Sequence, residues 1–343
     1  MKLSIRHLLF IAFFLISLNV SAQVEFVKNV SNKGTVAASF LEIGVNARAE
    51  AMGGAYTAQR GNADIIYWNP AGLAFVDGVS TSFSNMEWLA NTSFNFASVA
   101  VPLTTINSVL AGSFTTLGVP EQAVRADNGD LTGEFYDARD FAVNLSLATR
   151  LTDSFSFGVS TKYISQRIWS ETAVGVGFDF GVNYETPLDG LRIGASISNF
   201  GDDISIGGKN LKDIIDPDLQ NQGVNNIPVQ YVTEEYPLPQ IFRFGLAYDW
   251  KGESMSVSSA IDLMHPTGST ESMNMGLEWG FKELVFARVG YQNLFEKDHI
   301  NGLTLGAGIQ YKLNHSESFT FDYALSEWGM LGKVHRISVG ISL

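Results

Sequence analysis

Long stretches of the chain alternate between apolar and polar residues with a period of two. Between Val174 and Glu185 every second residue is Val, Phe or Tyr, whereas the residues between them are mostly Gly, Asp and Asn. The same pattern recurs over residues 140–147, 242–250, 302–313 and 319–325. Because successive side chains of a strand point to opposite faces, the pattern predicts strands that have one apolar face.

Applied to the whole chain, this pattern predicts fourteen strands, each about long enough to cross a bilayer at a tilt. The expected ranges are 79–88, 93–102, 108–117, 138–150, 155–167, 173–185, 190–199, 240–250, 254–264, 272–281, 284–293, 301–313, 318–327 and 334–343. The polar face carries mainly small residues, which suits the crowded interior of a barrel better than a surface in water. The sequence therefore predicts an all-β fold, a 14-stranded antiparallel transmembrane β-barrel over residues 79–343.

The connections expected between these strands are sorted by length. All those longer than five residues follow odd-numbered strands, and the two longest, 118–137 and 200–239, are rich in Asp and Glu. Outer-membrane barrels have short periplasmic turns and longer external loops. The two long connections are therefore predicted to be acidic external loops. Their acidic residues match no calcium-loop spacing, so no metal is expected.

Composition agrees with a surface that faces lipid. The chain has 343 residues, of which 45% are hydrophobic and 17% charged, with 33 glycines, no cysteine and a formal net charge of -13. A hydrophobic excess of this kind fits either a large core or a lipid-facing surface, and the period-two pattern favours lipid. The acidic balance excludes the electrostatic attraction on which nucleic-acid binding depends. The absence of cysteine excludes disulfides and a thioether lipid anchor.

The first 22 residues have the pattern of a secretory signal peptide. Lys2 and Arg6 precede an apolar run over 8–18, and Val20, Ser21 and Ala22 supply small residues for cleavage. The mature chain is then expected to begin at Gln23. The alternative is a retained anchor, but the apolar run is about half the length that a spanning helix needs.

Residues 23–78 lack the period-two pattern. They contain many small residues and a Gly53–Gly54 pair, which permit close backbone approach and positive φ angles. We therefore expect this segment to lie inside the barrel, the alternative being a loosely ordered periplasmic tail.

The motifs of this segment resemble those of the PorV/PorQ family of outer-membrane proteins, a branch of the FadL-like barrels. The similarity rests on Ala-Arg-Ala at 47–49, Met-Gly-Gly-Ala at 52–55 and Tyr-Trp-Asn-Pro-Ala-Gly-Leu at 67–73. It implies an N-terminal hatch that plugs the lumen, with its motif at Ala47, Arg48, Ala49, Met52, Gly53, Gly54, Asn69, Pro70, Ala71 and Gly72. The chain departs from the family pattern over 59–62 and at its last residue, Leu343, where an aromatic residue is usual.

The resemblance also implies a location in the outer membrane of a Gram-negative-type bacterium, and two functions. Proteins of the PorV kind serve the type IX secretion system, with the C-terminal signal domains of secreted cargo and other secretion components as partners. FadL-like relatives instead admit hydrophobic small molecules and release them sideways into the membrane. Protein export is the first expectation and a hydrophobic channel, with an apolar tunnel and a gap near the third strand, is the alternative. A soluble periplasmic β protein is the third.

No catalytic motif is present, so neither an enzyme nor a cofactor is expected. His335 lies beside Arg336 near the start of the last strand, which places it at the barrel rim. Strand parity directs charged side chains of both signs into the lumen: Lys162, Asp179, Arg192, Arg243, Asp262, Glu278, Arg288, Lys312, Asp322 and Arg336, together with Asp140 and Asp249. We expect them to pair and brace the hatch, because unpaired buried charges are costly. A conduction path is the alternative.

Overall fold

The computed structural model describes residues 33–216, 227–296, 299–313 and 317–343, which belong to the compact unit Ser31–Leu343. The expected signal peptide, 1–22, lies outside the described residues. No helix in the described part of the chain has the length and apolarity needed to cross a membrane.

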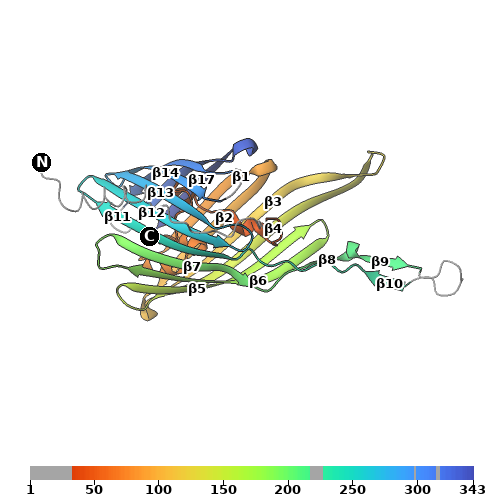
Figure 1. Cartoon of the computed structure of the whole chain (residues 1–343), viewed down its shortest axis with the longest axis horizontal. Coiled ribbons are helices and arrows are strands. Elements are labelled where there is room, and N and C mark those ends of the chain that lie inside the picture. Colours follow the sequence, from red (N-terminus) through yellow and green to blue (C-terminus); the bar gives the residue numbers. More distant parts are fainter. Residues whose placement is uncertain (1–32, 217–226, 297–298, 314–316) are drawn as a thin grey trace. The chain divides into compact units, whose positions relative to one another are not determined.

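Fourteen strands form a closed antiparallel barrel, as the sequence predicts (Figure 1). The strands are β1 (Ser80–Trp88), β2 (Thr92–Leu103), β3 (Ser108–Arg125), β4 (Leu131–Arg150), β5 (Phe155–Ile168), β6 (Glu171–Glu185), β7 (Leu191–Gly201), β11 (Ile241–Lys251), β12 (Met255–Pro266), β13 (Ser272–Phe281), β14 (Val285–Leu294), β15 (Leu303–Lys312), β16 (Ser318–Glu327) and β17 (Lys333–Ser342). Each pairs with its neighbour in the chain, β7 pairs with β11, and β1 pairs with β17 to close the ring.

The two faces of the strands divide as their parity indicates. On β6, Val176 and Phe178 are exposed at 49% and 41%, whereas Asp179 and Asn183 of the opposite face are fully buried. The exposed outer surface carries rows of Phe, Val, Ile and Leu on the other strands as well. A barrel with an apolar outside and a polar inside is arranged for a lipid environment.

The barrel has two distinct ends. We call the end that carries the connections β3–β4 and β7–β11 the loop end, and the opposite end the turn end. The prediction of a loop over 118–137 is wrong, because β3 and β4 continue past the barrel as a paired hairpin (Figure 1). Its turn at Asn128–Gly129, with Gly129 at φ +88°, is a strong hairpin signal, and Pro120, which has no N–H, lies where the register shifts.

The connection from β7 to β11 also contains regular structure. It includes β8 (Ile206–Gly208), η5 (Lys209–Leu211), β9 (Lys212–Ile215) and β10 (Ile227–Gln230). Strand β8 extends the sheet by pairing with the start of β6, and β9 pairs with β10. Residues 217–226 lie outside the described part.

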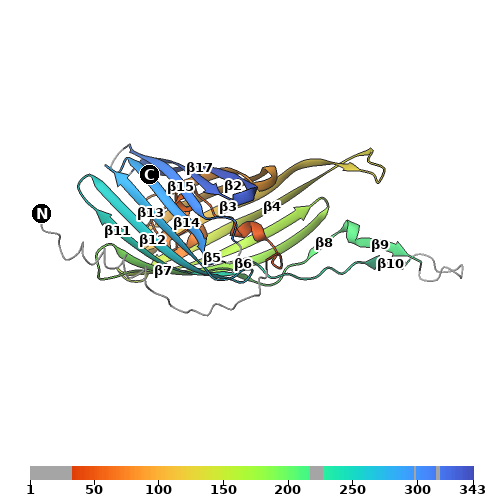
Figure 2. The same ribbon diagram turned by 45° about the horizontal axis from the view of Figure 1, so that its top comes forward.

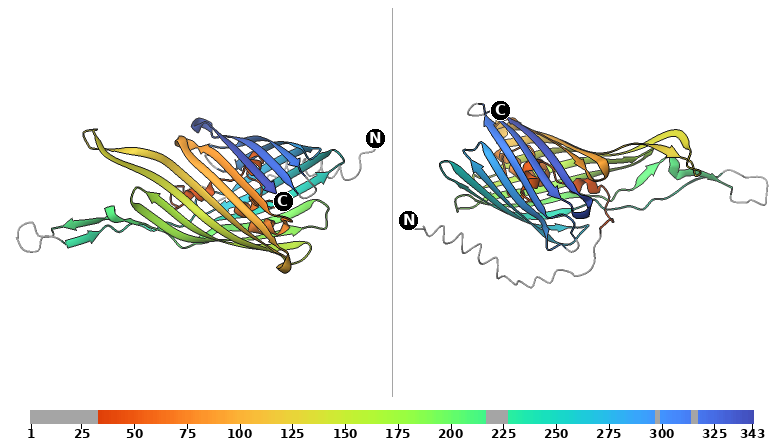
Figure 3. Two further views of the ribbon diagram at one scale, coloured as in Figure 1. Left: turned by 180° about the vertical axis from the view of Figure 1, so that it is seen from behind. Right: turned by 90° about the horizontal axis from the view of Figure 1, so that it is seen from above.

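The N-terminal segment, 33–78, contains short helices: η1 (Ser39–Glu42), α2 (Ala47–Ala51), α3 (Ile65–Trp68) and η2 (Pro70–Phe75). Helix α2 contacts β14–β17, whereas η2 contacts β3–β6. These strands lie on different sides of the ring, and Figures 2 and 3 show the helices within it. The short helices η3 (Leu89–Asn91), η4 (Thr104–Ile106) and η6 (Gly329–Leu331) belong to connections between strands.

The face assignment is tested by a pair of neighbouring substitutions on β6. Val176→Lys places a charge among exposed apolar side chains and should destabilise the barrel by roughly 2 to 4 kcal/mol in a bilayer. Gly177→Ser adds an inward hydroxyl, and the nearest atoms to its Cβ, the methyl groups of Ile164 and Leu238, are 3.4 Å away. We expect the serine variant to assemble normally. Equal assembly of both variants, judged by heat-modifiable gel migration, would contradict the assignment.

Candidate functional site

The candidate site is the interface between the N-terminal segment and the inner wall, and its densest part surrounds Arg48. Asn46 caps α2 by accepting a hydrogen bond from the Arg48 backbone N–H at 2.7 Å. The Arg48 guanidinium donates to both carboxylate oxygens of Glu278, at 2.8 Å each. Glu278 also binds Arg288 at 2.5 Å, and Arg288 binds Asp322 at 2.6 Å. Strand parity predicted the wall residues of this network, and the structure joins them to the motif arginine.

A second charged contact was missed in the sequence. Glu50 of α2 is 6% exposed and lies 2.8 Å from the Arg336 guanidinium, and Gln292 donates to it at 3.1 Å. Beside it, the Ala47 N–H donates to Ser338 Oγ at 2.7 Å. Glu50 is in a segment without strand periodicity, so no pattern indicated which way it would point.

Asp262 holds the backbone of the segment directly. Its Oδ2 accepts hydrogen bonds from the N–H groups of Tyr56 and Thr57, both at 2.9 Å, and from the Thr57 hydroxyl at 2.6 Å. No basic side chain of the described residues forms an ion pair with it. Asp262 therefore contacts the segment through two backbone N–H donors and one hydroxyl, and not through a charge ladder.

Arginines on the neighbouring strands β7 and β11 contact the segment in other ways. Arg192 pairs with Asp249 at 2.7 Å and also donates to Ala58 O and Gln59 Oε1, at 3.2 Å each. Arg243 donates to Ser198 Oγ at 3.1 Å and lies 5.8 Å from the ring centroids of Tyr67 and Trp68, which is within cation–π range.

The remaining inward charges have partners within the wall. Lys162 lies 2.9 Å from Asp179 and 2.7 Å from Asn199 Oδ1. Asp140 accepts from Gln166 at 3.1 Å.

The placement of Lys312 in the lumen is wrong. Lys312 is the last residue of β15, so its side chain is at the rim of the turn end, where it is 54% exposed and pairs with Glu283. This hydrogen bond lowers the pKa of Glu283. Parity assigned the face correctly, but the strand ends before the residue can enter the lumen.

The Asn69–Pro70–Ala71 motif connects two parts of the segment to the wall. Asn69 Oδ1 caps η2 by accepting from Ala71 N at 3.0 Å, and its Nδ2 donates to Thr57 O at 2.8 Å and to Val182 O at 2.9 Å. Ala71 O accepts from Ser156 Oγ at 3.0 Å. Asn69 is fully buried, and a side chain without both an acceptor and donors could not make these contacts.

Glycines let the segment approach the wall backbone to backbone. Gly53 has φ +68°, and a Cβ there would lie 2.6 Å from Met275 O. A Cβ at Gly290 would lie 2.1 Å from Gly53 N, and one at Gly276 would lie 2.3 Å from Met52 O. Gly54 at φ +69° and Gly72, whose Cβ would lie 2.6 Å from Ile65 Cγ1, are similarly restricted, and Ala49 and Met52 are fully buried. The small residues of the hatch motif thus allow the segment to pack closely against the barrel wall.

Part of the inner wall is apolar. Strands β2 and β5 direct Phe94, Phe96 and Ile164 inward, each buried to within 1%. Near the loop end Ile164 packs in one cluster with Phe40 and Leu41 of the segment and Ile204 and Leu238 of the β7–β11 connection. Parity did not predict this zone, which we call the apolar zone, because the pattern is inverted at Phe94 and Phe96, where the outward residues Ser93 and Asn95 are polar.

The apolar zone is closed in this conformation. A cavity of about 10 Å³, no more than the room of one water molecule, lies between Leu41, Tyr67, Phe96 and Ala142 on one side and the polar residues Ser113, Thr115, Asn144 and Lys162 on the other. The wall beside it has no gap at the third strand, since β3 pairs with β2 from Gly118 to Ser108 without interruption. A larger cavity, of about 120 Å³, lies at the turn end and has a mainly polar lining.

The described residues contain no cluster of three or more His, Cys, Asp or Glu side chains suited to hold a metal. His335 is on the outer face near the loop-end rim, where its Nδ1 lies 2.6 Å from the Tyr323 hydroxyl. His7 and His315 lie outside the described residues.

Comparison with known proteins identifies the fold. No family model matches the chain, and no curated protein matches it. Solved structures do. They include the toluene transporter TbuX of Ralstonia pickettii (TM-score 0.52, 14% identity, covering 87% of this chain and 97% of that one) and the toluene transporter TodX of Pseudomonas putida (0.53, 13%, 87% and 97%). The CymD monoaromatic hydrocarbon channel is similar as well (0.54, 13%, 87% and 96%).

The chain therefore has the fold of these barrels. They are described as transporters and channels and not as enzymes.

The close backbone contact at Gly290 is tested by Gly290→Ala. The added methyl group would overlap the Met52–Gly53 backbone, so the segment must shift, and we expect the unfolding free energy to fall by about 1 to 3 kcal/mol. Urea unfolding of the refolded barrel measures this. Gly112→Ala is the control, because its nearest contact is Asn144 O at 3.6 Å. An equal effect of both changes would show that Gly290 has no special role.

Proposed function

We propose that this protein is an outer-membrane channel for small hydrophobic molecules, located in a Gram-negative-type bacterium. The apolar zone is the observation that carries the proposal, because it offers an apolar solute a favourable surface on an inner wall that also carries many buried charges and hydroxyls. The fold is that of barrels described as toluene transporters and monoaromatic hydrocarbon channels. On this proposal the protein is not an enzyme and has no cofactor.

A solute would reach the zone by displacing the side chains that fill it. Leu238 and Ile204 belong to the β7–β11 connection at the loop end, and Phe40 and Leu41 belong to the N-terminal segment. Neither set is part of the barrel wall, so both can move while the strand ladder stays intact. The segment 33–78 then acts as the hatch that separates the apolar zone from the turn end.

The test of this function is uptake of radiolabelled toluene by cells that express the protein or a variant. Ile164→Asn puts an amide into the apolar zone, and an unpaired amide costs about 1 to 3 kcal/mol, so we expect roughly tenfold slower uptake. Ile106→Asn is the matched control, since Ile106 is 58% exposed in a turn-end connection. Both variants must show heat-modifiable migration. If wild-type cells take up toluene no faster than cells without the protein, the proposal fails.

A second candidate function is protein export of the PorV/PorQ type, with the C-terminal signal domains of secreted cargo and other secretion components as partners. Its support is the exposed apolar surface of the β3–β4 hairpin beyond the barrel, where Leu131 and Phe135 are 63% and 57% exposed. On β9, Ile214 is 63% exposed. Apolar side chains displayed on long external hairpins suit a protein partner better than water.

Surface display of cargo distinguishes this function from the first. A deletion strain complemented with the Leu131→Ser, Phe135→Ser double variant should lose display of secreted proteins but keep toluene uptake. The Leu151→Ser, Leu188→Ser double variant changes side chains that are 61% and 67% exposed at the turn end, and it should behave as wild type. Normal cargo display in the deletion strain itself would exclude the export function.

A further inference from the structure

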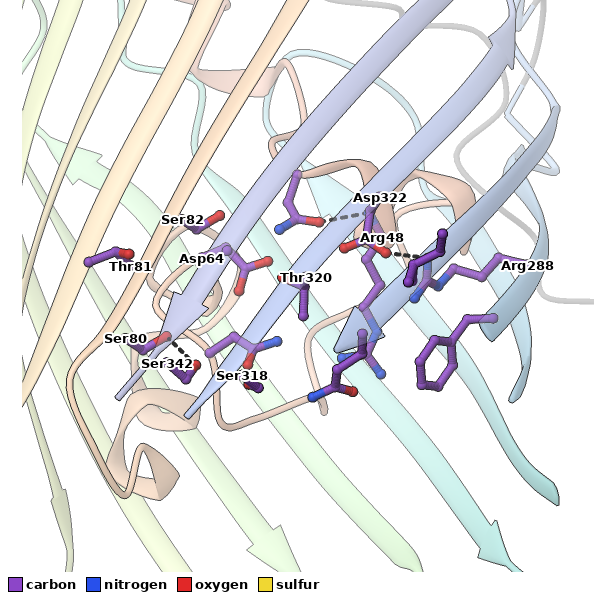
Figure 4. Close-up of a pocket in the computed structure, with 16 residues that line it drawn as sticks. Arg48, Asp64, Ser80, Thr81, Ser82, Arg288, Ser318, Thr320, Asp322 and Ser342 are labelled. Carbon is purple, nitrogen blue, oxygen red and sulfur yellow. Dashed lines mark hydrogen bonds and ion pairs between the residues drawn. The ribbon is translucent and has the colours of Figure 1, made fainter. Parts of the chain in front are cut away.

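A polar cavity of about 120 Å³ lies at the turn end, between the N-terminal segment and the wall (Figure 4). It lies beside the first residues of β1 and β16 and the end of β17. Inward hydroxyl groups from these strands line much of it, those of Ser80, Ser82, Ser318, Thr320 and Ser342, whereas Thr81 borders it with its hydroxyl donated to Ile341 O on the exposed face. Neither proposed function uses this cavity.

Asp64 projects into the cavity from the residue that precedes α3 (Figure 4). Asp64 is only 1% exposed. The Asn46 side chain and the backbone N–H of Asp64 itself lie close enough to lower the pKa of the carboxylate, but neither contact has the geometry of a full hydrogen bond, and no other group in the described part of the chain reaches either oxygen. The hydroxyl of Ser82, on the cavity wall, also lacks a partner among the described residues. Buried polar groups are nearly always satisfied, so these atoms indicate that water or an ion occupies the cavity.

The charges around the cavity leave one negative charge uncompensated. Arg48 and Arg288 are matched by Glu278 and Asp322, to which they are bound. Asp64 forms no ion pair with any described residue, although the charge of Arg48 acts on it. Burial raises the pKa of Asp64 to about 6. The carboxylate is therefore mostly ionised at neutral pH and brings a negative charge to the cavity.

We propose that this cavity binds a small monovalent cation, an alkali-metal or ammonium ion, with Asp64 as its charged ligand and the wall hydroxyls as neutral ligands. A single positive charge balances the site. A divalent ion would exceed that balance beside two arginines, and calcium normally takes six to eight oxygen ligands that include several carboxylates. The volume leaves room for water molecules that complete the coordination.

The bound ion links the N-terminal segment to the first and last strands. Asp64 belongs to the segment, whereas Ser80 and Ser82 belong to β1 and Thr320 to β16. A cation held between them binds the folded arrangement and not the unfolded chain, so it stabilises the folded protein.

The full-length protein in detergent at pH 8 provides the test. Unfolding temperatures are compared at equal ionic strength in sodium, potassium, methylammonium and N-methyl-D-glucamine chloride, the last cation being too large for the cavity. We expect a rise of about 2 to 5 °C with at least one small cation over N-methyl-D-glucamine. The ²³Na resonance should broaden in the presence of protein and sharpen when a tighter small cation is added.

Asp64→Asn should remove both effects, because the amide keeps the shape but not the charge. Asp77→Asn is the matched control in the same segment, where the Asp77 side chain is 95% exposed, and it should retain them. Should Asp64→Asn fail to assemble, Ser82→Ala tests the same site through a neutral ligand and should weaken cation affinity several-fold. Equal unfolding temperatures of the wild type in all four salts would overturn the proposal. The proposal would also be overturned if the unfolding temperature changed with pH but not with the choice of monovalent cation. The same holds if only divalent cations raised the unfolding temperature.

Discussion

The pairing of β1 with β17 is the constraint on which the other features depend. Seven residue pairs, from Ser80↔Ser342 to Met86↔Arg336, join the first strand to the last. In hydrocarbon an unpaired strand edge leaves backbone groups without partners at several kcal/mol each, so the sheet is viable there only as a ring. Closure fixes which face of every strand looks inward. It thereby brings charges from strands that are distant in the chain into one lumen.

The N-terminal segment satisfies much of what the wall turns inward. Without Arg48 of the segment, Glu278 would be paired with Arg288 alone. Without Glu50 of the segment, Arg336 would lose its carboxylate partner. Asp262 receives three hydrogen bonds from Tyr56 and Thr57. Removing one partner of a buried charged pair costs far more than the pair contributes, so the wall and the segment are mutually dependent. The motif glycines permit the backbone approach that these contacts need.

Most of the barrel could be predicted from the sequence because lipid requires apolar side chains on the outer face of each strand. Crowding in the lumen favours small polar side chains on the inner face. The limits of β3 and β4 were missed because they extend beyond the bilayer, where that restriction ends. Inward charges such as Arg288 follow from parity, whereas Glu50 and Asp64 belong to a segment without periodicity, so no rule gave their direction. The apolar zone was hidden for a different reason, since Phe94 and Phe96 face inward while their neighbours Ser93 and Asn95 face outward, which is the reverse of the rule that places apolar residues outside.

The path of the N-terminal segment has a consequence for the entropy of folding. Ser80 and Ser342, which begin and end the seam, are 262 positions apart in the chain. Joining them directly would require closure of a loop almost as long as the barrel sequence, at an entropic cost that grows with loop length. The segment that immediately precedes β1 already contacts β14–β17 through α2. The contacts of the segment and the pairs of the seam close the same long loop, so both sets of interactions offset a single entropic cost.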